Sequence, residues 1–164
     1  MLIIALIFLV VLTLLSLSTS QTTVMDERMT SNSKDRQLAL QATEAATRDA
    51  ESLLESFVSI AAFTGTGGLL RTMDAEPNYL DATQWTSTHS MAYRQTIAGV
   101  AAQPRFIIKM VGEIVPLSNT KSLNIGGYGQ QGGGKTYGFR ITARGSGGTG
   151  TAAAVIQCDY GKAF

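Results

Sequence analysis

The chain has 164 residues, of which 45% are hydrophobic and 15% charged, with a formal net charge of +1 and a single cysteine. This length suits one domain with a modest core. The near-neutral charge argues against nucleic acid as a partner, because non-specific binding to phosphate depends on clustered Lys and Arg. One cysteine excludes an internal disulfide, and no Cys/His group has the spacing of a zinc site.

Residues 1–25 form an uncharged N-terminal segment, in which an almost unbroken apolar run from Met1 to Leu15 is followed by Ser and Thr. About 20 helical residues at roughly 1.5 Å each cross a hydrocarbon core of about 30 Å, and a helix satisfies its own backbone there. A removable secretory signal needs a basic start and a small-residue cleavage site, and neither is evident. The segment is therefore predicted to be a membrane helix.

Residues 26–62 are predicted to continue this helix, since the first glycine of the chain is Gly65 and all three prolines follow it. One helix to about residue 60 would be on the order of 90 Å long, whereas a plain membrane anchor would be followed by a linker. Its apolar side chains recur at intervals of three and four, which is typical of one helix face. The residues expected to pack on a sheet are Ala39, Ala42, Ala46, Ala50, Leu53 and Phe57. The opposite face either is solvated or meets neighbouring subunits, and carries Asp35, Arg36, Glu44, Arg48, Asp49, Glu51 and Glu55.

Residues 63–104 form a connecting region with a weaker pattern. A helix beginning near Asp81 would direct Trp85, Met91 or Ala92, and Ile97 toward the core. The only histidine, His89, stands beside Ser and Thr and is assigned no role.

Residues 105–164 are predicted to form an antiparallel sheet with glycine-rich loops. Apolar side chains alternate over residues 106–111 and 137–144, and a third run from Ala152 to Tyr160 follows the turn cluster GSGGTG. The alanine face of the long helix can cover one side of this sheet, so the fold class is α+β. In the third strand Cys158 is expected to face the helix.

Residues 129–136, GQQGGGKT, satisfy the phosphate-binding pattern G-x-x-x-x-G-K-[ST]. In that motif a helix follows and its N-terminus binds phosphate. Here the residues after Thr136 alternate like a strand, and residues 137–164 are too few for a parallel α/β sheet. We interpret the segment as a loop or hairpin connection, and we expect no nucleotide, other cofactor, metal ligand or catalytic residue.

The pattern ERM-x-x-N-x-x-DR-x-LA-x-QA-x-EAA-x-R-x-AE runs from Glu27 to Glu51. In this pattern the chain resembles PilX-type pilins of type IV pili, and residues 103–112 and 137–157 look like strand segments of the same family. The resemblance implies a type IV pilin fold and a filament subunit without enzymatic activity. Its implied partners are other copies or other pilins, the membrane before assembly, the inner-membrane assembly machinery and prepilin peptidase. The implied location is the bacterial inner membrane before assembly and an extracellular filament afterwards.

The same resemblance assigns roles to the N-terminal residues. Met1 is expected to be the mature N-terminus and to be methylated after a leader is removed. The residues expected in the filament core are Leu2, Ile3, Ile4, Ala5, Leu6, Phe8, Leu9, Leu12 and Leu15.

Residue 5 leaves two functions open. Most type IV pilins carry a glutamate at this mature position, where it is thought to pair with the N-terminal ammonium of an adjacent subunit, but this chain has Ala5. Loss of that glutamate is a feature of some minor pilins thought to cap the filament tip. The chain is therefore predicted to be a structural pilin subunit or, alternatively, a minor tip or priming pilin.

Overall fold

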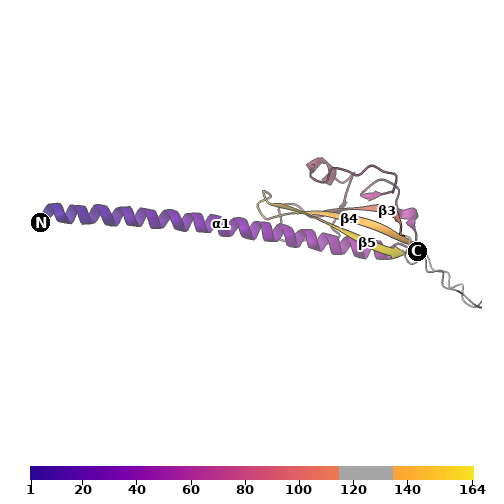
Figure 1. The fold of residues 1–164 in the computed structure, drawn as a ribbon, viewed down its shortest axis with the longest axis horizontal. Helices are drawn as coiled ribbons and strands as arrows, with labels where there is room; N and C mark the ends of the chain where they lie inside the picture. Colours follow the sequence, from indigo (N-terminus) through magenta and orange to yellow (C-terminus); the bar gives the residue numbers. More distant parts are fainter. Residues whose placement is uncertain (115–134) are drawn as a thin grey trace, which may run out of the picture.

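The computed structural model describes residues 1–114 and 135–164. A single long helix, α1 (Leu2–Ser56), is followed by a small domain that packs against its C-terminal half (Figure 1). The elements after α1 are η1 (Ile60–Ala62), β1 (Leu69–Leu70), η2 (Ala82–Trp85), β2 (Met91–Ala92), β3 (Arg105–Glu113), β4 (Thr136–Ser146) and β5 (Ala153–Ala163). This arrangement confirms the predicted α+β class.

Helix α1 is continuous over 55 residues, as the absence of glycine and proline predicted, and it is about 80 Å long. It ends at Ser56 rather than near residue 60. The Lys162 ammonium donates to the carbonyl oxygens of Leu54, Glu55 and Phe57 at 2.7–2.8 Å. These include carbonyls that have no partner within the helix, and Phe57 takes an extended conformation beyond them.

The sheet has the strand order β1-β3-β4-β5, and β2 also pairs with β3. Strands β3, β4 and β5 are antiparallel, as predicted, with Ile108 opposite Ile141 and Ile141 opposite Cys158. Strand β1, however, is parallel to β3, so the sheet is mixed rather than purely antiparallel. Two residues are too few to show an alternation, and the sequence pattern therefore carried no sign of β1.

The core lies between α1 and one face of the sheet. Its aromatic centre is the pair Phe63 and Phe139, whose rings stack with centroids 5.0 Å apart. The other buried core residues are Ala46, Ala50, Leu54, Phe106, Ile108, Ile141 and Ala143.

The connecting region covers part of the opposite face of the sheet (Figure 1). The predicted helix after Asp81 is wrong beyond one short turn, η2, which the Asp81 carboxylate begins by accepting the Thr83 N–H at 2.9 Å. The Thr86 carbonyl then accepts the N–H groups of both His89 and Ser90 and turns the chain. Met91 consequently pairs with Phe106 in a strand.

Candidate functional site: the bare helix and its junction with the domain

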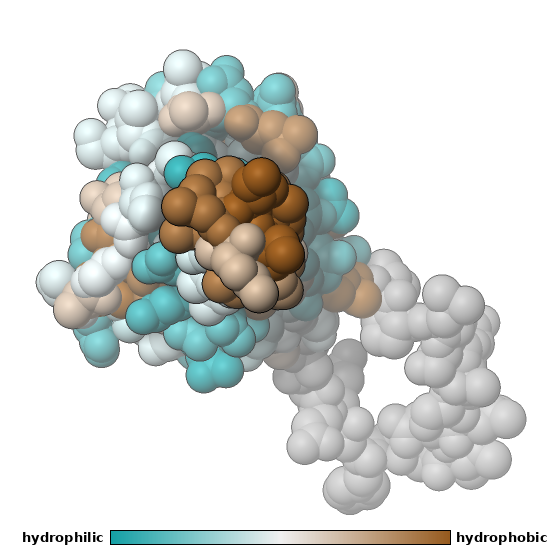
Figure 2. Space-filling view, turned by 90° about the vertical axis from the view of Figure 1, so that its left-hand side faces the viewer, coloured by the Kyte–Doolittle hydropathy of each residue, from teal (hydrophilic) through white to brown (hydrophobic). Residues whose placement is uncertain are grey.

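The N-terminal half of α1, up to the residue before Asp35, begins with a long run of exposed apolar side chains. We call this part of the helix the bare half. The large side chains predicted for the filament core, Leu2, Ile3, Ile4, Leu6, Phe8, Leu9, Leu12 and Leu15, are 56–80% exposed, and Met1 and Ala5 are exposed as well. Viewed from its N-terminal end, the helix presents a cluster of apolar residues (Figure 2). This stretch is long and apolar enough to cross a membrane. Removing these eight large side chains from water is worth on the order of 12–24 kcal/mol, so the bare half requires an apolar environment.

Four threonine hydroxyl groups in the N-terminal half of α1 are satisfied within the helix itself. Thr19, Thr22 and Thr23 donate to the carbonyl oxygens four residues earlier at 3.0–3.1 Å, and Thr13 donates to Val10 at 2.8 Å. Such bonds leave no free hydroxyl donor on these threonines. These threonines are therefore compatible with lipid or with a helix bundle.

The seam between α1 and the sheet is built from small residues. The predicted residues Ala39, Ala42, Ala46 and Ala50 are at most 1% exposed. Gly145 on β4 lies so close that an added Cβ would stand 2.8 Å from the Ala39 carbonyl oxygen. The helix and the sheet thus approach to backbone contact at this end of the seam.

At the other end of the seam larger side chains take over. Leu54 is fully buried, whereas the predicted Leu53 and Phe57 are only partly buried against the core. Leu54 continues the four-residue step of Ala42, Ala46 and Ala50, and this spacing was the signal that the sequence analysis missed.

Part of the charged face of α1 contacts the domain itself. The sequence left two alternatives for this face, solvent or neighbouring subunits, and neither describes the whole of it. Arg94 donates from its side chain and backbone to the Asp49 carboxylate, with Nε to Oδ1 at 2.7 Å. Tyr160 on β5 donates to Glu55, and the Cys158 thiol lies 4.0 Å from the Glu51 carboxylate. Cys158 therefore lies in β5 and faces the helix, as predicted, and burial raises the pKa of its thiol, with Glu51 adding to the effect.

Asp35 marks the point where the bare half of α1 ends. Its carboxylate accepts the Thr149 N–H at 3.0 Å and the Thr149 hydroxyl at 2.6 Å, which together hold the loop of residues 147–152 on the helix. These bonds, the hydroxyl first, lower the pKa of Asp35. Gly147 is required beside this contact, because an added Cβ would stand 2.4 Å from the Asp35 carboxylate. Sequence reasoning had placed Asp35 on the charged outer face, but the structure buries it.

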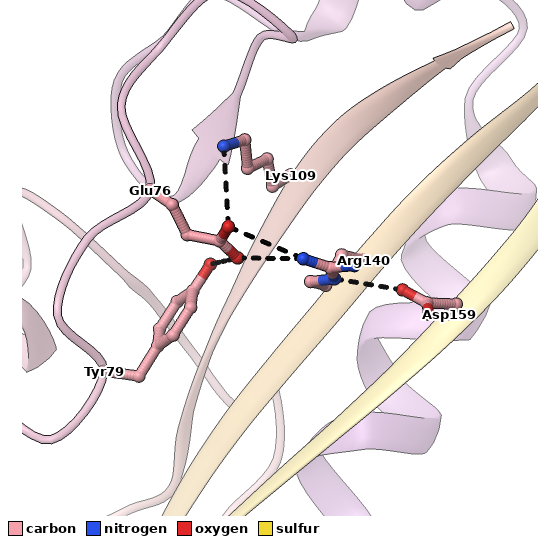
Figure 3. Close-up of polar contacts among 5 residues, drawn as sticks. All are labelled: Glu76, Tyr79, Lys109, Arg140 and Asp159. Atoms are coloured by element: carbon pink, nitrogen blue, oxygen red, sulfur yellow. Dashed lines mark hydrogen bonds and ion pairs between the residues drawn. The ribbon is translucent and has the colours of Figure 1, made fainter.

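A charged network fastens the connecting region to the outer face of the sheet (Figure 3). Arg140 lies between Glu76 at 3.3 Å and Asp159 at 3.1 Å, and both carboxylates raise its pKa. Glu76 also accepts the Tyr79 hydroxyl and pairs with Lys109 at 3.9 Å. Pairs this exposed contribute little one by one, but the network fixes the position of the Glu76 segment.

The described ranges bear on the two kinds of site that the sequence raised, a metal site and a phosphate-binding loop. Over residues 1–114 and 135–164, no three His, Cys, Asp or Glu side chains gather as metal ligands would. Gly129 to Gly134 of the phosphate-binding pattern lie outside the described residues. Thr136 begins strand β4, in place of the helix that a phosphate site requires, and Lys135 pairs with Glu113 at 3.0 Å.

A membrane-length helix that continues without a break into the core of a small sheet domain defines a pilin-like protein. Residues 1–48 match the family described as PilX N-terminal, and residues 34–162 match the family described as type IV pilus assembly protein PilX C-term. The chain belongs to the PilX family of type IV pilus assembly proteins. No curated protein and no solved structure matched it.

Proposed function

We propose that the chain is a structural subunit of a type IV pilus or a pilus-like filament and that it polymerises through the bare half of α1. The observation that carries this proposal is the exposure of every apolar side chain from Met1 to Leu17 on a helix joined rigidly to a folded domain. In the bacterial inner membrane these side chains contact lipid, and in a filament they contact the helices of neighbouring pilins. Since lipid tails are also apolar, close packing between helices decides the transfer.

The other partners follow from the same proposal. A prepilin peptidase removes a leader, the amine of Met1 is methylated, and the inner-membrane assembly machinery extracts the subunit into an extracellular filament. The seam residues from Ala39 to Phe57 hold the domain on the helix during this transfer. Mass spectrometry of the subunit from purified pili tests the modification, because replacing a hydrogen of the Met1 amine by a methyl group makes the N-terminal peptide heavier by one CH2 unit.

Replacing Leu9 by Arg tests the role of the bare helix. A charged side chain near the centre of an apolar helix costs about 2.5–3.5 kcal/mol, so the variant should be missing from sheared pili. Ser31→Arg is the matched control, because Ser31 lies on the same helix outside the apolar run and is exposed. Immunoblots of pili and membrane fractions separate failed assembly from failed insertion. Normal amounts of the Leu9→Arg chain in pili would contradict the proposal.

A second candidate function is that of a minor pilin at the filament tip, and the observation that favours it is Ala5. A repeating subunit has a neighbour whose N-terminal ammonium would pair with a carboxylate at residue 5, and a buried charge is costly without such a partner. A terminal subunit has no neighbour on one side and needs no carboxylate. Immunogold labelling separates the two functions, because gold along whole filaments contradicts a tip-only position.

The variant Ala5→Glu extends this test. If the missing carboxylate confines the chain to the tip, the variant should spread label along the filament. Ala5→Gln controls for the size of the side chain without supplying a charge.

A further inference from the structure

Two arginines face each other on the outer side of the sheet. Arg105 on β3 and Arg144 on β4 are directly opposite in the strand register. Like charges at such positions repel, so the pair destabilises the isolated chain. The Arg105 guanidinium is held in place by uncharged acceptors, with Nε to the Ser90 hydroxyl at 2.7 Å and Nη2 to the Thr86 carbonyl at 3.1 Å.

Among the described residues, Arg105 and Arg144 lack the carboxylate partner that the other Lys and Arg residues of the domain have. Each remaining Lys and Arg described after α1 has a carboxylate within 4.0 Å: Arg71, Arg94, Lys109, Lys135, Arg140 and Lys162. Within the described part of the chain, Arg105 and Arg144 form no ion pair. Residues 115–134 contain no Asp or Glu, so that segment has no acidic side chain to offer them.

Both arginines line one cavity of about 270 Å³, which we call the arginine pocket. Its remaining wall includes the apolar residues Trp85, Ala101 and Ala102 and the polar residues Gln103 and Ser146. The cavity lies beside the loop that Asp35 holds, since the Ala101 N–H donates to the Gly147 carbonyl at 2.8 Å. The strand ends joined by this loop lie at the end of the domain nearest the bare half of α1 (Figure 1), and the pocket, which Gly145, Ser146 and Gly150 help to line, is therefore at that end.

We propose that the arginine pocket binds an acidic side chain of a neighbouring pilin subunit. Two guanidinium groups match the two oxygens of a carboxylate, and the apolar residues of the wall accommodate its methylene stem. The inference rests on the proposed function, because subunits whose bare helices share a bundle and are staggered along it place one domain next to this end of another. The pocket then supplies an electrostatic contact between domains in addition to apolar contact between helices.

The first experiment uses the full-length chain in detergent and the variant Arg144→Ala. Arg140→Ala is the matched control, because Arg140 lies four residues away on the same face and has two carboxylate partners. Thermal unfolding is followed by the fluorescence of Trp85, the only tryptophan. We expect Arg144→Ala to leave Tm unchanged or to raise it, and Arg140→Ala to lower it. An equal loss of Tm in both variants would show that Arg144 already has a partner, and would overturn the proposal.

The second experiment adds glutarate, a small carboxylate with a methylene stem, or inorganic phosphate, each against sodium chloride at equal ionic strength. Glutarate should shift the emission of Trp85 in the wild type and in Arg140→Ala, but not in Arg144→Ala. If phosphate acts and glutarate does not, the pocket is selective for a free inorganic anion and the proposed partner is wrong. If neither acts, there is no anion site.

The third experiment measures incorporation into pili. Arg144→Glu should reduce the amount in sheared pili by about tenfold or more, with an unchanged amount in the membrane fraction, since a lost charge pair is replaced by repulsion. Normal incorporation of Arg144→Glu, together with exclusion of Leu9→Arg, would refute the pocket and leave the proposed function intact. If the wild type itself is absent from pili, the proposed function fails, and the glutarate experiment still decides whether the pocket binds a carboxylate.

Discussion

Replacing Gly145 by alanine perturbs the closest approach between α1 and the sheet. The added Cβ would stand 2.7 Å from the Thr43 hydroxyl, 2.8 Å from the Thr43 backbone nitrogen and 2.8 Å from the Ala39 carbonyl oxygen. Two of these three atoms belong to the helix backbone and cannot turn away as a side chain does. The helix and β4 must therefore separate locally.

The expected cost follows from this geometry. Forcing an extra methyl group into a packed seam costs about 1–3 kcal/mol, and the smaller entropy of the unfolded alanine chain offsets about 0.4–1 kcal/mol. We expect a net destabilisation of about 1–2 kcal/mol, which for a chain of this size lowers Tm by about 2–8 °C. Gly138→Ala is the control on the same strand, because its Cβ would meet the exposed Ile114 side chain at 3.2–3.3 Å, whereas the nearest backbone atom, the Gly112 carbonyl oxygen, is at an ordinary contact distance of 3.8 Å. It should be neutral or slightly stabilising.

The assay is thermal unfolding of the full-length chain in detergent, followed by Trp85 fluorescence rather than by helix content, since detergent preserves the bare half of α1. The double variant Gly145→Ala with Thr43→Ala removes the hydroxyl and leaves both backbone contacts. Its Tm should stay low. A full return to the wild-type Tm, or an equal loss in Gly138→Ala, would refute the argument from backbone contact.

Three further outcomes are expected. Leu54→Ala should destabilise the domain by about 2–5 kcal/mol, because Leu54 is fully buried, and the half-exposed neighbour Leu53→Ala should cost clearly less in the same urea titration. Asp35→Asn should alter the pH dependence of Tm: the lowered pKa of Asp35 stabilises the fold above the unfolded pKa of about 3.9, and this contribution is lost as the pH falls through the folded value. The variant should therefore have a lower Tm than the wild type at pH 7 and a flatter loss of Tm below about pH 4, and identical profiles would contradict the role of Thr149. Alkylation of Cys158 in the folded chain should be slow, because burial and Glu51 raise the pKa of the thiol and only the thiolate reacts. Labelling as fast as in the unfolded chain would refute this placement.

The sequence predicted the elements that depend on local pattern. The continuity of α1 followed from the absence of glycine and proline, and its buried face from residues such as Ala42 and Ala46 at four-residue intervals. Strands β3, β4 and β5 followed from alternation. Each of these signals is carried by neighbouring residues, so one sequence is enough to show it.

The connecting region shows which features local sequence patterns cannot predict. Strands β1 and β2 have two residues each and exist because they pair with β3, far along the chain. Asp35 was expected on a polar face, and its contacts with the loop of residues 147–152, far along the chain, bury it. Arg105 and Arg144 are opposite each other because of the register between β3 and β4, and the spacing of the two arginines in the sequence does not reveal that register. Long-range pairing decided all of these features.

Helix α1 is continuous from its bare half into the seam. It therefore fixes both the position of the domain along the helix axis and the rotation of the domain about that axis. Residues 26–34 separate the uncharged segment from Asp35, where the domain begins, and as a helix they are about 14 Å long. A flexible tether of the same length would let the domain turn freely, whereas this segment transmits torsion. Inserting one residue there would rotate the domain by about 100° about the helix axis relative to the apolar side chains. The phase of α1, as well as its length, therefore fixes which face of the domain a neighbouring subunit meets.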